Sequence, residues 1–248
     1  MELAVDTSSS TAGIALSHKG KILAELVWQS AQNHTVELMP NLAYLLHQAN
    51  VKPNFLEAII VAKGPGSFNS LRVGISIAKG LAFSLNIPLL GISTLEAEAY
   101  SFSYTGLPLC PIHKAGREEI AVALYQQKDK QWQCLQGEHL TTLGALCQQI
   151  HQKTLFCGEI PDNMISHIQR NLDQLAIIPQ SISLSRISSL AILGWQRLDK
   201  GERDDLSTLQ PLYLRPPSIT KPRKITLPVS PRQTRGLNNR SDSSFQLR

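Results

Sequence analysis

The segment from residue 58 to residue 92 most restricts the fold of this 248-residue chain. An apolar run at 58–62 predicts a short buried strand, and residues 71–85 place their apolar side chains at helical spacing. A second apolar run at 87–92 predicts another buried strand. Two strands joined through a helix require a crossover connection, which indicates a parallel region in a sheet.

The first 50 residues show a different pattern, because strand signals follow one another without an intervening helix. Apolar stretches at 1–5, 12–18 and 22–29 predict an antiparallel meander. Residues 34–50 have helical periodicity interrupted by Pro40, so we expect a helix that begins just before Pro40 or a kinked one. A capping-box motif, Ser93-Thr94-Leu95-Glu96, predicts the start of a third helix. An antiparallel meander followed by strands that are joined through helices predicts a mixed sheet.

The second half of the chain is less regular. We expect strands at 109–113, 120–126, 132–136 and 155–157, and helices at 142–151 and 185–198, with loop from Leu206 onward. A lobe boundary near residue 103 and the start of the basic tail at residue 215 divide the chain into three parts. These are a first lobe at 1–103, a second lobe at 104–214 and a tail at 215–248.

The formal net charge of +5 is unevenly distributed along the chain. Residues 215–248 hold eight Lys and Arg, five prolines and one acid, whereas residues 1–214 carry a formal charge of −2. A basic, proline-rich segment without apolar periodicity predicts a disordered tail. The alternative is that this tail makes a weak electrostatic contact with RNA phosphates.

Composition narrows the possible classes of protein. The 42% hydrophobic content is typical of a folded globular chain, and no apolar run approaches the ~18 residues of a membrane helix. Glu2 follows the first residue and no basic region precedes an apolar one, so we expect no secretory signal. The four cysteines form no C-x-x-C pair, which argues against a zinc ribbon and fits free thiols. We therefore expect a cytoplasmic protein without membrane contact.

Two loops could bind an anion or a cation. Asp6, Thr7 and Ser8 follow the first predicted strand, where a carboxylate and two hydroxyls could hold magnesium or phosphate oxygens. A turn in which these side chains satisfy their own backbone is the alternative. Gly64, Gly66 and Ser67 would let the backbone approach an anion at a helix start, although no Walker loop is present. The alternative is a tight strand-to-helix connection.

Other motifs lack the partners that catalysis needs. His34 and Glu37 do not make a metalloprotease helix, because Leu38 stands where the second histidine would be. Cys157-Gly158-Glu159 offers a single glycine, which fits a strand end better than a nucleotide loop. No nucleophile elbow is present. We therefore predict no catalytic residue and no metal ligand in this chain.

The motifs together resemble the TsaB (YeaZ) family over about residues 1–215. The matching segments are Asp6-Thr7-Ser8, Gly13-Ile14-Ala15-Leu16, the stretch from His34 to Pro40, Gly64-Pro65-Gly66-Ser67-Phe68 with Leu71-Arg72-Val73-Gly74, Pro88 with Gly91-Ile92-Ser93-Thr94-Leu95, and Pro211-Leu212-Tyr213-Leu214-Arg215. Two departures stand out. Asn69-Ser70 replaces the family's Thr-Gly, and His113-Lys114 occupies a turn where the family often has an acid.

The resemblance implies an α/β fold of the actin/hexokinase/Hsp70 type, with two ribonuclease H-like lobes, mixed sheets and a degenerate second lobe. It also implies a subunit without catalysis of its own, which binds a TsaD-type transferase and is joined by a TsaE-type ATPase. The complex transfers a threonylcarbamoyl group to the adenosine beside the anticodon of tRNA. ATP or ADP and a metal are then expected on the partner subunits, and none in this chain.

The resemblance further implies that the helices at 34–50 and 71–86 contact the partner, or a second copy of this chain. The candidate contact residues are His34, Leu38, Leu42, Leu45, Leu71, Ile75, Ala78 and Ala82. Two other functions stay open. One is a stand-alone ATPase or sugar-kinase-like phosphotransferase that uses Asp6 and the Gly64 loop. The other is a glycoprotease, which the missing second histidine disfavours.

Overall fold

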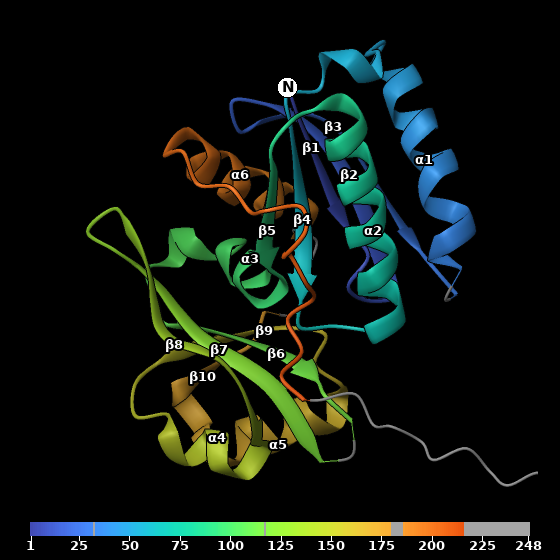
Figure 1. The fold of residues 1–248 in the computed structure, drawn as a ribbon. Coiled ribbons are helices and arrows are strands. Elements are labelled where there is room, and N and C mark those ends of the chain that lie inside the picture. Colours follow the sequence, from blue (N-terminus) through green and yellow to red (C-terminus); the bar gives the residue numbers. More distant parts are fainter. Residues whose placement is uncertain (32, 117, 180–185, 216–248) are drawn as a thin grey trace, which may run out of the picture. The chain divides into compact units, whose positions relative to one another are not determined.

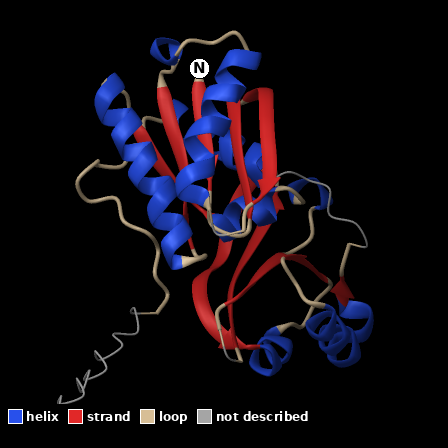
Figure 2. Ribbon diagram, turned by 90° about the vertical axis from the view of Figure 1, so that its right-hand side faces the viewer, coloured by secondary structure: helices blue, strands red, loops and turns tan. Residues whose placement is uncertain are grey.

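The computed structural model describes residues 1–31, 33–116, 118–179 and 186–215. Two five-stranded mixed sheets form its framework, each with helices packed on it (Figures 1 and 2). The predicted fold class is confirmed in this arrangement. Expectations about the tail beyond residue 215 lie outside the described residues.

The first sheet has the order β3-β2-β1-β4-β5. Its strands are β1 (Glu2–Asp6), β2 (Thr11–His18), β3 (Lys21–Gln29), β4 (Ala58–Gly64) and β5 (Leu89–Ser93). The β1–β2 and β2–β3 pairs are antiparallel, whereas β1–β4 and β4–β5 are parallel. The expected meander followed by helical crossovers is therefore confirmed.

Helices cover both faces of this sheet (Figure 1). On one face lie α1 (His34–Gln48) and α2 (Phe68–Leu85), and on the other lie α3 (Thr94–Tyr100) and α6 (Arg186–Asp199). α1 begins at His34, where the helical periodicity of the sequence begins, and continues through Pro40. Ser93 Oγ accepts from the Glu96 amide at 3.4 Å, so the serine half of the predicted capping box is present.

The second sheet has the order β10-β9-β6-β7-β8. Its strands are β6 (Leu109–Lys114), β7 (Glu119–Lys128), β8 (Gln131–Thr142), β9 (Thr154–Gly158) and β10 (Ala176–Ile177). One face is covered by α4 (Leu143–Gln149) and α5 (Asp162–Leu172). The other face packs on α3, because Leu95 and Phe102 share a core with Leu109 and Tyr125. The sequence analysis missed α5, whose Met164, Ile168 and Leu172 recur at helical spacing, and the two-residue strand β10.

The chain does not divide into lobes at residue 103 as simply as expected. α6 follows the second sheet in sequence but packs on the first, where Ile187 and Leu190 join a core with Ala15 and Ile60. Residues 204–212 also return to the first sheet, since the Asp204 amide donates to the Leu89 carbonyl and that of Leu212 to the Lys63 carbonyl. The first sheet and the helices on it are thus completed by α6 and residues 204–212, which come late in the chain.

Short 3₁₀ turns connect several of these elements. They are η1 (Pro53–Phe55), η2 (Ser103–Thr105) and η3 (Asp173–Leu175). Among the described residues, none of the helices has both the length and the apolar character needed to cross a bilayer.

Candidate functional site

The two loops singled out in the sequence meet at the carboxyl end of β1. The Ser67 amide donates to the Ser8 carbonyl at 2.8 Å, and Thr7 Oγ1 donates to the Ser70 carbonyl at 2.7 Å. A Cβ at Gly66 would overlap the Ser8 carbonyl, and one at Gly74 would overlap Thr7 Oγ1. Glycine is therefore needed at both positions for β1 and α2 to approach this closely.

Asp6 is buried and fully engaged by protein groups. Its Oδ1 accepts from the Ser8 amide at 2.8 Å and from Ser8 Oγ at 2.7 Å, while Arg186 Nε donates to Oδ2 at 2.6 Å. The first two bonds form the self-satisfied turn that the sequence left as an alternative. The third bond places a guanidinium where a cation would sit beside this carboxylate.

Arg186, the first residue of α6, connects this turn to α3. Its Nη1 donates to Glu98 at 3.1 Å, and its Nη2 donates to Ser9 Oγ at 3.2 Å. Burial by itself would lower the pKa of Arg186, but the carboxylates of Asp6 and Glu98 raise it above its ordinary value. One guanidinium thus neutralises two buried carboxylates. Sequence analysis missed Arg186 and Glu98, because no local motif marks either residue.

Glu98 also faces His113, a residue of the second sheet. His113 Nε2 lies 3.8 Å from Glu98 Oε2, and both side chains are buried. Burial alone would raise the pKa of Glu98, yet the contacts with His113 and Arg186 outweigh it and lower the pKa to about 2. The cluster therefore brings together polar side chains from β1, α3, α6 and β6.

A cavity of about 350 Å³ adjoins the two loops. Its walls include Ser8, Ser9, Ser10, Gly66, Ser67, His113, Lys114, Ala115 and Glu159. Ser9 Oγ donates to Glu159 at 2.6 Å across this cavity. The Asp6 carboxylate is not among the lining groups, and Glu159 is already hydrogen-bonded. A magnesium–phosphate pair would need a free carboxylate here, so these residues do not fit that group.

The structure corrects the residues predicted for the partner interface. His34, Leu38, Leu42, Leu45, Leu71, Ile75, Ala78 and Ala82 are all buried. Six of the seven apolar ones belong to the core between the first sheet and α1 and α2, and the seventh, Leu71, is fully buried as well. Helical periodicity selects the stripe that faces the sheet, and that stripe carries the most regular apolar pattern. These side chains are therefore not available at the surface of this chain.

The outward faces of α1 and α2 carry other apolar side chains. Val36, Met39 and Tyr44 are exposed on α1, and Phe68 and Phe83 are exposed on α2, where the exposed fraction of Phe83 reaches 79%. Gly80 lies on the same side of α2, and a Cβ added there would meet no atom within 4 Å. A partner helix could therefore approach α2 closely at Gly80.

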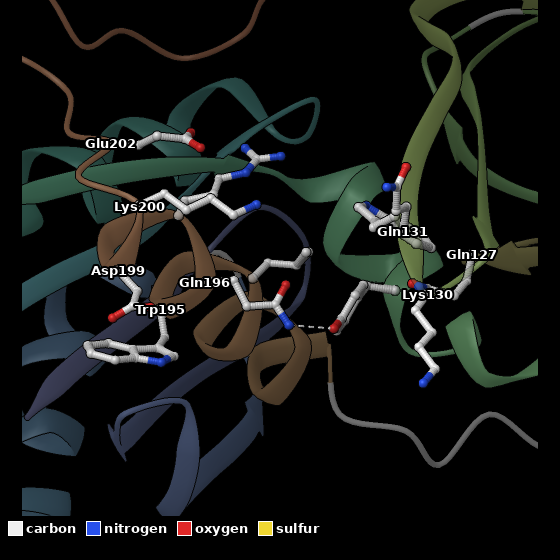
Figure 3. Close-up of a pocket in the computed structure, with 12 residues that line it drawn as sticks. Gln127, Lys130, Gln131, Trp195, Gln196, Asp199, Lys200 and Glu202 are labelled. Carbon is white, nitrogen blue, oxygen red and sulfur yellow. Dashed lines mark hydrogen bonds between the residues drawn. The ribbon is translucent and has the colours of Figure 1, made fainter.

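A larger cavity of about 800 Å³ lies between α6, the end of α3 and the β7–β8 hairpin (Figure 3). Its polar residues include Gln127, Lys130, Gln131, Gln196, Arg197, Asp199, Lys200 and Glu202. Gln196 Nε2 donates to Tyr100 Oη at 2.8 Å across it. No sequence pattern indicates this cavity, because the three elements are distant along the chain.

Comparison with known proteins places the chain in a family. A family model described as "TsaD: tRNA N6-adenosine threonylcarbamoyltransferase" matches residues 21–221. The "tRNA threonylcarbamoyladenosine biosynthesis protein TsaB" of Bacillus subtilis is 33% identical over 217 residues, covering 86% of this chain and 93% of its own. The structure of "YeaZ from Pseudomonas aeruginosa" superimposes with a TM-score of 0.71 at 23% identity, over 86% of this chain and 99% of that one.

A transferase is also similar to part of the chain. The "tRNA N6-adenosine threonylcarbamoyltransferase" of Nitratidesulfovibrio vulgaris is 34% identical over 110 residues, which cover 38% of this chain and 30% of the transferase. The similarity to the Bacillus subtilis TsaB extends over most of both chains, whereas the similarity to this transferase does not. The chain belongs to the TsaB (YeaZ) branch of the family that the matching model describes.

Proposed function

We propose that this chain is a non-catalytic subunit in the biosynthesis of threonylcarbamoyladenosine in tRNA, and that it acts in the cytoplasm. It binds a TsaD-type transferase, which a TsaE-type ATPase joins, and supports transfer to the adenosine beside the anticodon. The similarity to TsaB proteins supports this role. The observation that carries the proposal is the ion pair between Asp6 and Arg186. A working nucleotide site would leave the Asp6 carboxylate free, whereas here Arg186 is bound to it.

The proposed docking surface consists of the outward faces of α1 and α2. Tyr44 and Phe83 are its most exposed aromatic residues, and aromatic residues often provide most of the binding energy of an interface. Because a similar helix pair is expected in the paralogous transferase, four helices would pack against one another. A second copy of this chain could use the same surface when the transferase is absent.

Nucleotide and metal are proposed to reside on the partner subunits. An acyl transfer to an amine needs an electrophile held in place and donors for the developing oxyanion. In the described part of the 350 Å³ cavity, the single carboxylate accepts a hydrogen bond from Ser9. The reactive groups are therefore assigned to the transferase.

Co-purification with the TsaD-type transferase tests the docking surface. Tyr44→Glu together with Phe83→Glu should abolish co-elution, because two buried charges without partners would oppose association. Tyr104→Glu serves as the matched control, since Tyr104 has an exposed fraction of 77% but lies on η2. Circular dichroism should show that both variants are folded. Co-elution of the folded double variant at wild-type yield would contradict the proposed surface.

Reconstitution tests the function itself. The transferase, the ATPase, the donor and tRNA are combined with or without this chain, and formation of threonylcarbamoyladenosine is measured by mass spectrometry. We expect the product to depend on the chain, and to be lost with the double variant. Equal product in the absence of the chain would contradict the proposal.

A stand-alone ATPase or phosphotransferase is the second candidate, because the Asp6 turn and the Gly66 loop do meet beside a cavity. Titration calorimetry of the isolated chain with ATP and magnesium tests this function. Tight binding followed by turnover would favour it over a supporting role. Our proposal predicts that no turnover is measured with the isolated chain.

A further inference from the structure

We propose that one stripe on the outward face of α2 selects a carboxylate-bearing surface of the TsaD-type transferase. The stripe, called here the α2 stripe, consists of Phe68, Arg72, Ser76, Lys79 and Phe83. These positions are three or four residues apart, so they follow one line along the helix. All five side chains are exposed or half-buried. The identity of the partner rests on the proposed function, and the inference adds the chemistry by which that partner is recognised.

The α2 stripe carries two cations, and the surrounding sequence supplies no acid. Residues 58–95 contain three cations but neither Asp nor Glu. Among the residues that the structure describes, neither Arg72 nor Lys79 has a carboxylate oxygen within 4.0 Å. Arg186 and Arg197, by contrast, both bind carboxylates of the chain itself. In the described part of the chain, the two charges of the α2 stripe are therefore not neutralised by an ion pair.

Aromatic rings hold the Arg72 side chain in place. Its Cζ lies 4.7 Å from the centroid of the Phe68 ring. Phe68 in turn stacks on Tyr213, with the ring centroids 4.9 Å apart. Cation–π contacts of this kind orient a guanidinium and leave its N–H donors available at the ring edge. Because the side chain is already ordered, a carboxylate that binds it costs less conformational entropy.

The aromatic residues of the stripe favour a protein partner over a nucleic acid. Phe68 and Phe83 flank the two cations, and both rings are exposed. Protein interfaces combine aromatic residues and arginine around an apolar centre, whereas nucleic-acid interfaces are more polar and more strongly positive. Asp and Glu carboxylates are the protein groups that pair with guanidinium and ammonium ions. The stripe therefore fits an acidic protein surface.

A second copy of this chain is a poor match for the stripe. In a two-fold dimer the same surface meets itself, so four cations would face one another without an acid from α2. The neighbouring α1 has one acid, Glu37, which accepts a hydrogen bond from Trp28 Nε1 at 3.1 Å. Like charges that are brought together oppose association. Charge complementarity therefore favours the transferase over a second copy.

The spacing of the two cations specifies what the partner should present. Arg72 and Lys79 are seven residues apart, which corresponds to about 10 Å along the helix axis. Two acids seven residues apart on a partner helix would have the same separation. Ser76 lies between the two cations, and its small side chain lets a partner helix approach. We therefore expect two Asp or Glu residues two turns apart on the transferase helix that meets α2.

Binding of the full chain to the TsaD-type transferase at two salt concentrations tests the proposal. The test variant combines Arg72→Gln with Lys79→Gln. The matched control combines Lys128→Gln with Lys153→Gln, two exposed lysines outside α1 and α2. Both variants lose two positive charges. A third variant, Arg72→Lys with Lys79→Arg, keeps both charges of the stripe.

We expect the test variant to bind the transferase about 10-fold more weakly at about 50 mM NaCl, because two ion pairs are not formed. Its Kd should change little when NaCl is raised to about 500 mM, whereas that of the wild type and the control should rise about 10-fold. The charge-keeping variant should retain the wild-type salt dependence.

Self-association provides a readout that should move in the other direction. Sedimentation of the test variant should show unchanged or stronger self-association, because repulsion between copies is removed. A chain that is merely misfolded would lose both kinds of association. Weaker self-association of a folded test variant would contradict the charge argument.

Failure of this inference can be told apart from failure of the proposed function. Wild-type affinity and salt dependence in the test variant, or equal losses in test and control, would overturn the inference alone. If the wild-type chain does not bind the transferase, the proposed function fails and the inference fails with it. Loss of tRNA binding by the isolated test variant, with transferase binding unchanged, would assign the two cations to RNA and would also overturn the inference.

Discussion

Arg186 Nε lies 2.6 Å from Asp6 Oδ2, although 180 residues separate the two in sequence. The pair joins the first residue of α6 to the end of β1 and brings α6 back onto the first sheet. The same guanidinium holds Glu98 of α3. The Arg186 guanidinium therefore links β1, α3 and α6. It lies where proteins of related fold would be expected to bind a ligand.

Removal of this cation should strongly destabilise the fold. Arg186→Met leaves two buried carboxylates without a partner, and we expect a loss of about 3–5 kcal/mol in the free energy of unfolding. Urea denaturation followed by circular dichroism measures the loss. Arg203→Met, at an exposed position, is the control and should change little. A loss below about 1 kcal/mol in Arg186→Met would contradict the structural role assigned here.

Stability should fall in acid because of Glu98. Its pKa is lowered from 4.5 in the unfolded chain to about 2 in the folded one, so the unfolded state binds more protons between these values. The contribution is complete above about pH 4.5 and is lost as the pH falls toward 2. The contribution of Glu98 to the free energy of unfolding corresponds to about 3 kcal/mol.

The pH dependence can be assigned with two variants. Urea midpoints measured between pH 5 and pH 2 should vary less steeply in Glu98→Gln than in the wild type, because one titrating group is removed. Glu118→Gln, at an exposed position, should keep the wild-type slope. An unchanged slope in Glu98→Gln would show that other carboxylates cause the acid loss.

Two glycines of α2 should respond in opposite ways to alanine. A Cβ at Gly74 would overlap Thr7 Oγ1, so Gly74→Ala should cost about 1–3 kcal/mol of stability. A Cβ at Gly80 meets nothing, and Gly80→Ala should raise stability by about 0.5–1 kcal/mol through helix propensity. Thermal melts compare the two. If α2 packs closely on the transferase, Gly80→Ala should also weaken co-elution while the chain melts at a higher temperature.

The cysteines should fall into two classes of reactivity. Cys134 is exposed, whereas Cys110 and Cys157 are buried. Burial raises the pKa of the Cys110 thiol to about 12, so little thiolate forms at neutral pH. A chromogenic disulfide reagent should modify Cys134 in the folded chain, and Cys110 and Cys157 only after unfolding. Peptide mass mapping identifies the modified sites, and rapid labelling of Cys110 in the native chain would contradict the described burial.

Much of the fold followed from local pattern. Apolar runs bounded by turn signals located β1 through β5, period-3.6 spacing located the helices between them, and two strands joined through a helix indicated the parallel crossover. α5 was overlooked although Met164, Ile168 and Leu172 recur every four residues along its buried side, which is a helical signal. The eight residues predicted to contact a partner are buried in the folded chain. The periodic stripe that signals a helix is the one that the helix buries.

The sequence by itself determined the order of strands and helices from β1 through α3, the two candidate loops at Asp6 and at Gly66, and the family resemblance. These depend on residues that are neighbours along the chain or that follow a fixed spacing. Tertiary structure alone decided that Arg186 and Glu98 complete the Asp6 site, that α6 packs on the first sheet, and that Lys130 and Lys200 line one cavity. Charge pairing between distant segments leaves no periodic trace in a sequence, because any of several arginines could satisfy a buried carboxylate. Only packing selects the one that does.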